Sequence, residues 1–338
     1  PSQKKQSLQE VDVIIRRRAQ AGAKVIVVST VKTDLAGHQN AILLQLKAGS
    51  DPVLLAGLMS AVLAEGAAPA AKGSDALKKA LVGVDEAASG SGVSAEQIIA
   101  AGKAYAAAKQ PVVVIGTGIS GSEEASMQAL NLALVKNAGV LPLMLEANAL
   151  GALRMGCQSD RGPGFAKAKI TGAGYRDMKS GMKALMIAGA IPDADFTSDF
   201  VVVLASHMTG LAEKADVVLP LAALYEKQGT IMNTYGVIKT LSPAQPAAGD
   251  SKGGLDIAAE LSQAIGTTKG FTLKDIAAGV KKVKAGKLSA SSFKPVAAET
   301  VTSVAVSASG LLLAMNQGLL SGSGVAKVMV VKQPMLQK

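Results

Sequence analysis

The sequence is poor in the residues that hold metals, clusters and stacked ligands. Among 338 residues there are one cysteine (Cys157), two histidines and no tryptophan, and aromatic residues make up 3%. One cysteine excludes an internal disulfide. It also excludes an iron–sulfur cluster held by this chain alone, because such clusters take about four cysteine ligands. A zinc site is disfavoured, since only His38 and His207 could add imidazole ligands.

Long apolar runs are missing as well. No stretch approaches the roughly 18 apolar residues that a membrane-spanning helix needs, and no apolar signal region opens the sequence. Yet hydrophobic residues make up 49%, and the mean hydropathy is +0.32. Abundant alanine can produce this value, but we favour burial of surface against other subunits.

The net charge of +10 raises the question of nucleic-acid binding. Basic residues are spread along the chain, apart from Arg16–Arg18 and the lysines between residues 274 and 287. Stacking aromatics are scarce and no nucleic-acid motif is present, so no nucleic-acid partner is predicted. Both basic runs are interpreted as solvated helix faces, with docking on an acidic neighbouring subunit as the alternative.

Apolar periodicity predicts alternating helices and strands, and therefore an α/β fold. The strand over 112–115, the helix over 123–137 and the strand over 140–145 should form a right-handed βαβ unit with a parallel sheet. Strands near residues 184, 201 and 216 are expected to extend that sheet. The other predicted elements are helices over 8–21, 52–64 (capped by Asp51), 94–109 (with a Ser94/Gln97 capping box), 254–265 and 268–292, strands over 24–30 and 327–331, and an apolar segment over 310–320.

Three segments follow from this pattern. Residues 1–110 are predicted to be the remnant of a first Rossmann-like domain with a helical linker, and residues 111–270 a second Rossmann-like domain. Residues 271–338 form a C-terminal extension. Within the first segment, residues 66–93 are rich in Ala, Gly and Ser and are expected to be partly linker or surface loop.

A glycine turn lies between the strand over 112–115 and the following helix. Gly116, Gly118 and Gly121 make a GxGxxG pattern, and Glu146 ends the next strand, 25 residues after Gly121. Such a turn lets backbone amides approach a pyrophosphate, and an acidic residue at that distance can bind a ribose. The pattern favours NAD or FAD binding, but two glutamates directly after the turn would oppose a phosphate.

The run DVVLP at 216–220, followed by EKQGTIMN at 226–233, resembles the molybdopterin oxidoreductase family. The stretches NALGALRMG at 148–156 and DRGPGF at 160–165 resemble one branch of it. That branch is the large iron–sulfur subunit of NADH:quinone oxidoreductase, the respiratory complex I. The resemblance covers roughly residues 13–266.

The resemblance implies Rossmann-like, doubly wound parallel sheets of the formate dehydrogenase and DMSO reductase type, entered partway through the fold. It implies a non-catalytic scaffold for the electron-transfer arm of the complex, with other subunits as partners. Such a chain would be cytoplasmic and attached to the inner membrane only through the complex. No cofactor is expected in this chain, and iron–sulfur clusters are expected only in sequence upstream of it.

Two alternatives remain open. One is part of a true molybdopterin-guanine-dinucleotide oxidoreductase resembling formate dehydrogenase, and the other is an NAD- or FAD-binding Rossmann oxidoreductase. No catalytic residue and no metal ligand is predicted, and Cys157 is interpreted as a small buried hydrophobic residue. His207 follows a strand, but no partner for it can be identified from the sequence. The candidate pocket lining is Lys32, Thr33, Gly116, Gly118, Gly121, Glu146, Glu226, Gly229, Thr230 and Asn233.

Two groups of these candidates also have a structural interpretation. Lys32 and Thr33 follow the first strand, where molybdenum enzymes of the family have an arginine-bearing loop that helps hold the pterin nucleotide. A lysine lacks the bidentate fork of arginine, and Thr33 with Asp34 is typical of a helix-capping turn. By resemblance, residues 226–233 border the pterin pocket of catalytic relatives, a pocket regarded as empty in the complex I branch. Asp216 and Asn233 could instead tie down loops through backbone hydrogen bonds.

Overall fold

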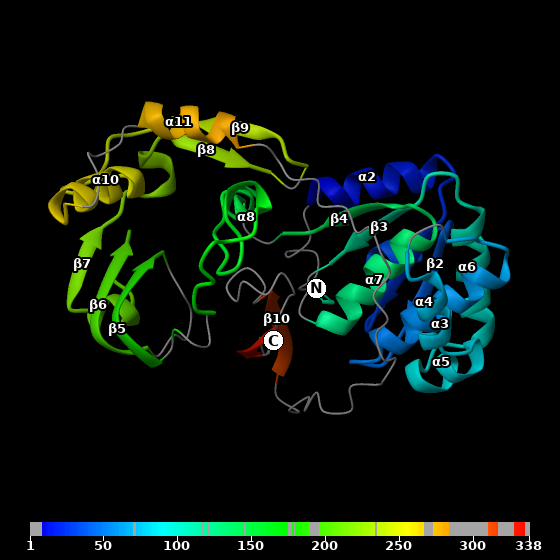
Figure 1. The fold of residues 1–338 in the computed structure, drawn as a ribbon. Helices are drawn as coiled ribbons and strands as arrows, with labels where there is room; N and C mark the ends of the chain where they lie inside the picture. The colour runs from blue at the N-terminus through cyan, green and yellow to red at the C-terminus, as the bar shows by residue number, and fades with distance from the viewer. Residues whose placement is uncertain are drawn as a thin grey trace. The chain divides into compact units, whose positions relative to one another are not determined.

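The computed structural model describes residues 9–69, 72–116, 118–119, 122–144, 147–174, 178, 180–189, 196–233, 235–266, 273–283, 310–316 and 328–334. Contacts within the chain divide it after residue 145, whereas the sequence placed a domain boundary after residue 110. The first unit holds the described residues up to 144 together with 310–316 and 328–334, and the second holds those from 147 to 283 (Figure 1). Each unit is described by itself.

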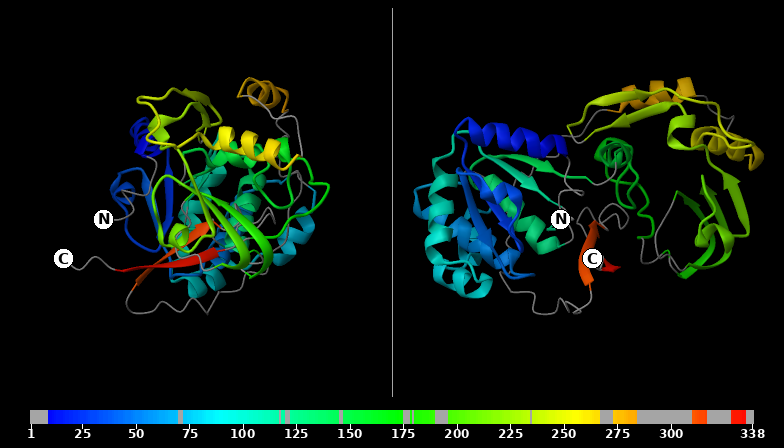
Figure 2. Two further views of the ribbon diagram at one scale, coloured as in Figure 1. Left: turned by 90° about the vertical axis from the view of Figure 1, so that its left-hand side faces the viewer. Right: turned by 180° about the vertical axis from the view of Figure 1, so that it is seen from behind.

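The first unit contains two pairs of parallel strands. Strands β1 (Val25–Ser29) and β2 (Ala41–Gln45) pair in register, and β3 (Val112–Ile115) pairs with β4 (Gly139–Pro142). The second pair confirms the predicted βαβ unit, because α7 (Glu123–Val135) connects β3 to β4. Strand β2, a five-residue AILLQ run, was not predicted. Figure 2 shows the part of this unit up to β4, blue to green, from two further sides, with its helices flanking the strands.

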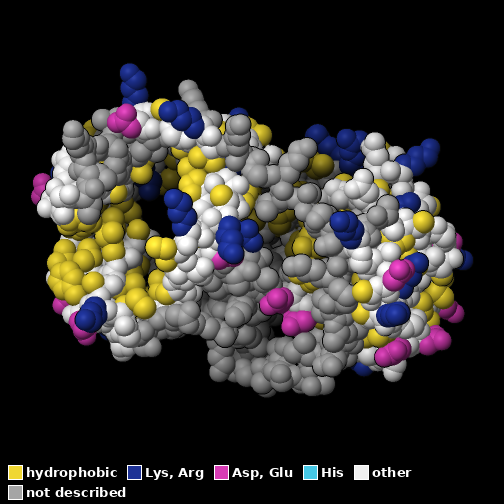
Figure 3. All heavy atoms as spheres, viewed as in Figure 1, with side chains coloured by type: hydrophobic (Ala, Val, Ile, Leu, Met, Phe, Trp, Pro, Cys, Tyr) yellow, Lys and Arg dark blue, Asp and Glu magenta, His cyan; other side chains and the backbone are white. Residues whose placement is uncertain are grey.

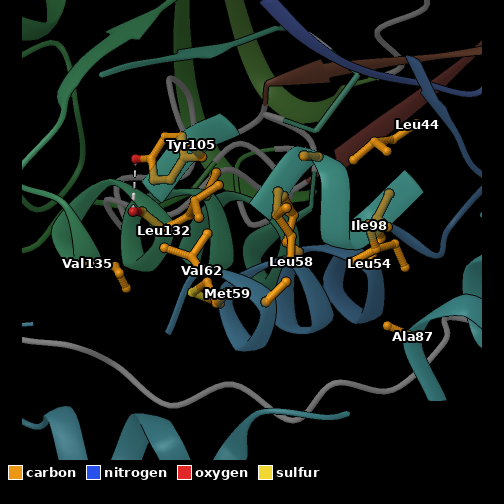
Figure 4. Packing of buried hydrophobic residues seen from close by; sticks show 14 of the residues in the cluster. Leu44, Leu54, Leu58, Met59, Val62, Ala87, Ile98, Tyr105, Leu132 and Val135 are labelled. Atoms are coloured by element: carbon orange, nitrogen blue, oxygen red, sulfur yellow. Dashed lines mark hydrogen bonds between the residues drawn. The ribbon is translucent and has the colours of Figure 1, made fainter. Parts of the chain in front are cut away.

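Helix α3 (Asp51–Ala64) is the centre of the first unit. Ten of its 14 residues are buried, because the helix is apolar on all sides and a helix of that kind is stable only inside a core. It packs against α5 (Val84–Ser91), α6 (Ala95–Ala107) and α7. Figure 4 shows Leu58 and Met59 of α3 beside side chains from α6 and α7.

Small residues let these helices approach closely. A Cβ atom built on Gly57 of α3 would lie 2.1 Å from Cβ of Ala87 on α5. One built on Gly102 of α6 would lie 2.5 Å from Cβ of Ala61 on α3. Both distances are far below van der Waals contact, so glycine at these positions sets the spacing of the helices.

Residues 66–93 were predicted to be partly linker or surface loop, and the described residues contain loops but also more helix than this composition suggested. They include α4 (Ser74–Ala80) and α5, and the side chains of Leu77 and Ala87 are fully buried. Composition misled here because the same small residues that suit a linker also suit close helix packing. Asp51 is also not the cap of α3: Ser50 occupies that position without a side-chain capping bond. The remaining helix, α2 (Gln9–Gln20), and the capping box of α6 agree with the sequence.

The second unit is built on a three-stranded parallel sheet. Its order is β5 (Ser180–Ala188), β6 (Thr197–Ala205), β7 (Val217–Pro220). The expectation that these strands extend the sheet of residues 112–145 was wrong for the described residues, where β3 and β4 pair only with each other. Sequence fixes the strand character of each run, whereas edge-to-edge pairing depends on contacts between distant segments.

The two faces of this sheet differ in exposure. One face carries Val201, Val203 and Ile187, which are buried in a cluster that includes α9 (Gly210–Glu213). Met186, Phe200 and Val217 belong to the opposite face by register and are 54%, 45% and 37% exposed. Hydrophobic side chains accordingly gather over β5–β7 in Figure 3.

The other elements complete the description. Strands β8 (Gly229–Met232) and β9 (Ile238–Leu241) form an antiparallel hairpin, which was not among the predicted elements. Strands β10 (Gly310–Asn316) and β11 (Val328–Pro334) also pair antiparallel, which confirms a strand near 327–331. Also present are η1 (Asp34–Gly37), α8 (Ala149–Arg154), η2 (Pro163–Phe165), η4 (Leu224–Glu226), α10 (Gly254–Ala264) and α11 (Leu273–Lys282).

Candidate functional site

The predicted pocket residues fall in both units. Lys32, Thr33, Gly116 and Gly118 belong to the first, and residues 226–233 to the second. Gly121 and Glu146 lie outside the described residues. In the first unit, Lys32 and Thr33 follow β1 and the two glycines follow β3; in the second, residues 226–233 run from η4 into β8.

Thr33 is part of a capping turn. Its Oγ1 accepts a hydrogen bond of 3.4 Å from the backbone N–H of Ala36 at the start of η1. This is the ordinary role of threonine before a helix. Lys32 precedes it with an exposed side chain, so the turn presents one positive charge beside the end of β1.

The backbone around Gly116 and Gly118 has open space. A Cβ atom built on either residue would meet no other atom of the protein within 4 Å, and neither residue has a positive φ. Glycine is therefore not demanded here by packing or conformation. The open space at Gly116 and Gly118 suits the close approach of a phosphate group. Ser122 caps α7 by accepting from Ala125 N–H at 3.1 Å.

Directly before β7 begins, the carboxylate of Asp216 joins this strand to β6. Its Oδ2 accepts a hydrogen bond of 2.7 Å from the backbone N–H of Val201, and its own N–H donates to the Val201 carbonyl at 3.0 Å. The D of the DVVLP run thus fixes the start of β7 against β6.

Glu226 ends η4 and lies beyond β7. Its Oε2 accepts from the backbone N–H of Ala223 at 2.9 Å, and its Oε1 accepts from Nε2 of Gln245 at 3.1 Å. These hydrogen bonds, that of Ala223 first, lower the pKa of Glu226, and the charge of His207 adds to the effect. Glu226 is therefore an ionised carboxylate with a fixed orientation.

Gly229, Thr230 and Asn233 belong to the hairpin rather than to an open loop. Gly229 and Thr230 are paired with β9. Oδ1 of Asn233 accepts from the N–H groups of Tyr235 at 3.0 Å and Val237 at 2.9 Å, which closes the turn. The amide side chain therefore shapes the chain reversal.

His207 has a neighbour that the sequence reasoning missed. Its Nδ1 lies 3.0 Å from Oγ of Ser206, within hydrogen-bonding distance, at the carboxyl end of β6. The two residues are adjacent in the chain, but adjacency alone does not predict a hydrogen bond between them, because the contact depends on the direction of both side chains. His38 instead accepts a hydrogen bond at Nδ1 from Asn40 N–H at 3.2 Å.

The NxxG stretch at 148–156 anchors α8 to the hairpin. Oδ1 of Asn148 accepts from the N–H of Met232 at 2.8 Å. A Cβ atom built on Gly151 would lie 2.2 Å from that same Oδ1 and 3.2 Å from Cβ of Met232. Gly156 has φ +88° and approaches Gly162 closely. In the sequence these residues indicated only a family resemblance, whereas the structure gives each of them a packing role.

Three predicted properties of the chain can be compared with the structure. Cys157 is exposed, so the expectation that it is buried was wrong. Within the described ranges, no three His, Cys, Asp or Glu side chains come together as a metal site would require. None of the helices in those ranges is long and apolar enough to cross a bilayer.

Comparison with known proteins gives consistent family matches. The model of the molybdopterin oxidoreductase family matches residues 3–264. NADH-quinone oxidoreductase subunit 3 of Thermus thermophilus is 35% identical over 181 residues, which is 53% of this chain and 22% of that protein. The alpha subunit of the NADPH-Fe(3+) oxidoreductase of Geobacter sulfurreducens is 27% identical over 73% of this chain and 35% of its own length.

A third relative aligns over more of the sequence. The alpha subunit of the F420-dependent formate dehydrogenase of Methanocaldococcus jannaschii is 26% identical over 80% of this chain and 47% of its own length. The chain thus spans less than half the length of each of these three relatives. Among solved structures, acetylene hydratase from Pelobacter acetylenicus has a TM-score of 0.55 at 16% identity, covering 74% of this chain and 44% of that one. That likeness supports the α/β fold.

Proposed function

Because the chain belongs to the molybdopterin oxidoreductase family, we propose that it serves as a scaffold module in the large subunit of an NADH:quinone oxidoreductase. In this role it would position neighbouring subunits and the electron-transfer arm without carrying a redox centre. The relative from Thermus thermophilus, a subunit of such an enzyme, supports the choice of branch.

The observation that carries this proposal is how the polar side chains of the family-like motifs in the second unit are used. Asn148, Asp216 and Asn233 each accept a backbone hydrogen bond that joins two elements or closes a turn. Glu226 accepts one from Ala223 and another from Gln245. Side chains that are hydrogen-bonded within the fold in this way make the unit rigid. A scaffold needs such rigidity to hold its neighbours in place.

The test is to isolate the protein from its source cells through a tag and to measure what accompanies it. We expect other subunits and NADH:quinone reductase activity to co-purify, with molybdenum and tungsten far below one atom per chain. Lys32→Ala should leave the stability and the metal content unchanged. Stoichiometric molybdenum or tungsten, or loss of a bound nucleotide in the Lys32 variant, would contradict the proposal.

A molybdopterin-guanine-dinucleotide enzyme is the second candidate. It is favoured by the formate dehydrogenase alignment, which extends over 80% of the chain, and by the open backbone at Gly116 and Gly118. These residues fit part of such a cofactor: the two glycines and Lys32 would hold the phosphates, and the cofactor would supply two-electron redox chemistry.

The NAD or FAD alternative has its own test. A ligand that binds the folded chain raises its melting temperature, so the melting temperature is measured with and without NAD or FAD.

A further inference from the structure

A surface pocket of about 360 Å³ lies beside Glu226. Its lining consists of Glu226, Pro243, Ala244, Gln245 and Pro246. The N–H of Ala244 donates to the Tyr225 carbonyl at 2.7 Å, and Gln245 donates to Glu226, so two bonds hold this wall against η4. The pocket combines apolar walls with a single carboxylate.

The carboxylate of Glu226 has unused acceptor capacity. Ala223 and Gln245 each donate one hydrogen bond to it, and the backbone of Ala248 contributes a further one. An ionised carboxylate offers about four acceptor sites, so part of its capacity is left for a ligand. A guanidinium group donates two parallel hydrogen bonds to the two oxygens of a carboxylate. The methylene stem of an arginine suits walls made by Pro243 and Pro246.

Two large side chains next to Glu226 are exposed. Leu224 and Tyr225 of η4 are 60% and 58% exposed and could contact a partner. Tyrosine and arginine are enriched among the residues that contribute most to protein–protein binding. Two cationic side chains lie near Glu226: Lys227 follows it directly, and the charge of His207 acts on the Glu226 carboxylate. Because these charges weaken the attraction for a further cation, recognition depends on hydrogen-bond geometry as well as on charge.

We propose that this pocket is a socket for an arginine side chain of a neighbouring subunit, with Leu224 and Tyr225 as its apolar rim. The proposal rests on the scaffold function, which requires contacts with other subunits. It adds the chemistry of the contact: a bidentate guanidinium on Glu226, with apolar residues of the partner on either side.

The first test uses N-acetylarginine amide as a probe on the whole chain, followed by backbone amide NMR. We expect saturable shifts at Ala223 and Gln245 at millimolar concentration. N-acetylcitrulline amide, which has the same shape without the charge, should bind on the order of tenfold more weakly. Glu226→Gln should weaken the arginine probe by a similar factor, and Glu213→Gln, an exposed carboxylate on α9, should not.

The second test uses the complex isolated from source cells. Glu226→Gln should lower the salt concentration at which a neighbouring subunit dissociates, and Glu213→Gln should leave it unchanged. Equal binding of arginine and citrulline, no binding of either, or unaltered dissociation of the Glu226 variant would each overturn the socket. Failure of the scaffold function is distinguishable, because the wild-type chain would then co-purify with no subunit at all.

Discussion

The side chain of Asn148 is bonded to the backbone of Met232, 84 residues further along the chain, at 2.8 Å. This contact joins the beginning of α8 to strand β8. Gly151 lies one helical turn further on and leaves the room that the contact needs. The relationship explains why an asparagine and a glycine occur three residues apart here.

We expect Asn148→Ala to destabilise the second unit. It removes the acceptor of the Met232 N–H, and an unsatisfied backbone donor costs about 1–3 kcal/mol in the free energy of unfolding. Urea denaturation measures the loss, and hydrogen exchange should be faster at the Met232 amide. Asn148→Asp keeps an acceptor at the same place and should retain most of the stability. Equal loss in both variants would contradict this role.

Helix spacing in the first unit predicts a cost for added volume. Gly102→Ala would place a methyl group against Ala61 of α3, so we expect a loss of about 1–3 kcal/mol from overpacking. Gly279→Ala is the matched control, because nothing lies within 4 Å of the new methyl on α11. That variant should be neutral or gain up to about 1 kcal/mol from helix propensity. Thermal denaturation distinguishes the two, and a neutral Gly102 variant would show that the helices can shift.

Tyr105 makes the free energy of unfolding depend on pH in alkaline solution. Its hydroxyl donates to the Leu132 carbonyl at 3.0 Å (Figure 4), and burial raises the pKa of the phenol above its ordinary value. The raised pKa means that this contribution is complete below about pH 10 and declines as the pH rises further. Tyr105→Phe should lose about 1 kcal/mol at pH 7. Its free energy of unfolding should also fall less steeply above pH 10 than that of the wild type, whereas parallel curves would contradict the assignment.

Glu226 gives the opposite pH dependence. Its pKa is lowered by hydrogen bonds from Ala223 and Gln245, so its stabilising contribution is present above the ordinary glutamate pKa and is lost as the pH falls through the lowered value. The difference in stability between wild type and Glu226→Gln should therefore shrink between about pH 6 and pH 3. NMR titration of the carboxyl carbon measures the pKa directly. An ordinary or raised value would contradict the geometry of η4.

The two faces of the β5–β7 sheet predict unequal costs for truncation. Val203 is fully buried, and Val203→Ala should cost about 2 kcal/mol. Phe200 is larger but 45% exposed, so Phe200→Ala should cost less in the isolated chain despite the greater loss of volume. Chemical denaturation of both variants checks the order. A larger loss of stability for Phe200→Ala than for Val203→Ala would contradict the exposure of the face that carries Phe200.

Local sequence determined the elements whose signals lie within a few residues. The capping box of α6 and the βαβ unit of β3, α7 and β4 follow from periodicity and from hydrogen bonds between near neighbours. The family also follows from the sequence, because the DVVLP run at 216–220 and the EKQGTIMN run at 226–233 are specific for it. These features depend on backbone conformation and apolar spacing, which a short stretch of residues encodes.

Tertiary structure decided what the same residues contact. Only the folded chain shows that Asn148 bonds to Met232, that Gly102 accommodates Ala61 and that the strands after residue 180 form a separate sheet in the described residues. It also placed Cys157 at the surface and Glu226 beside Gln245. The physical reason is that a side chain's role depends on which distant segment packs against it, and the spacing of residues along the chain does not contain that information.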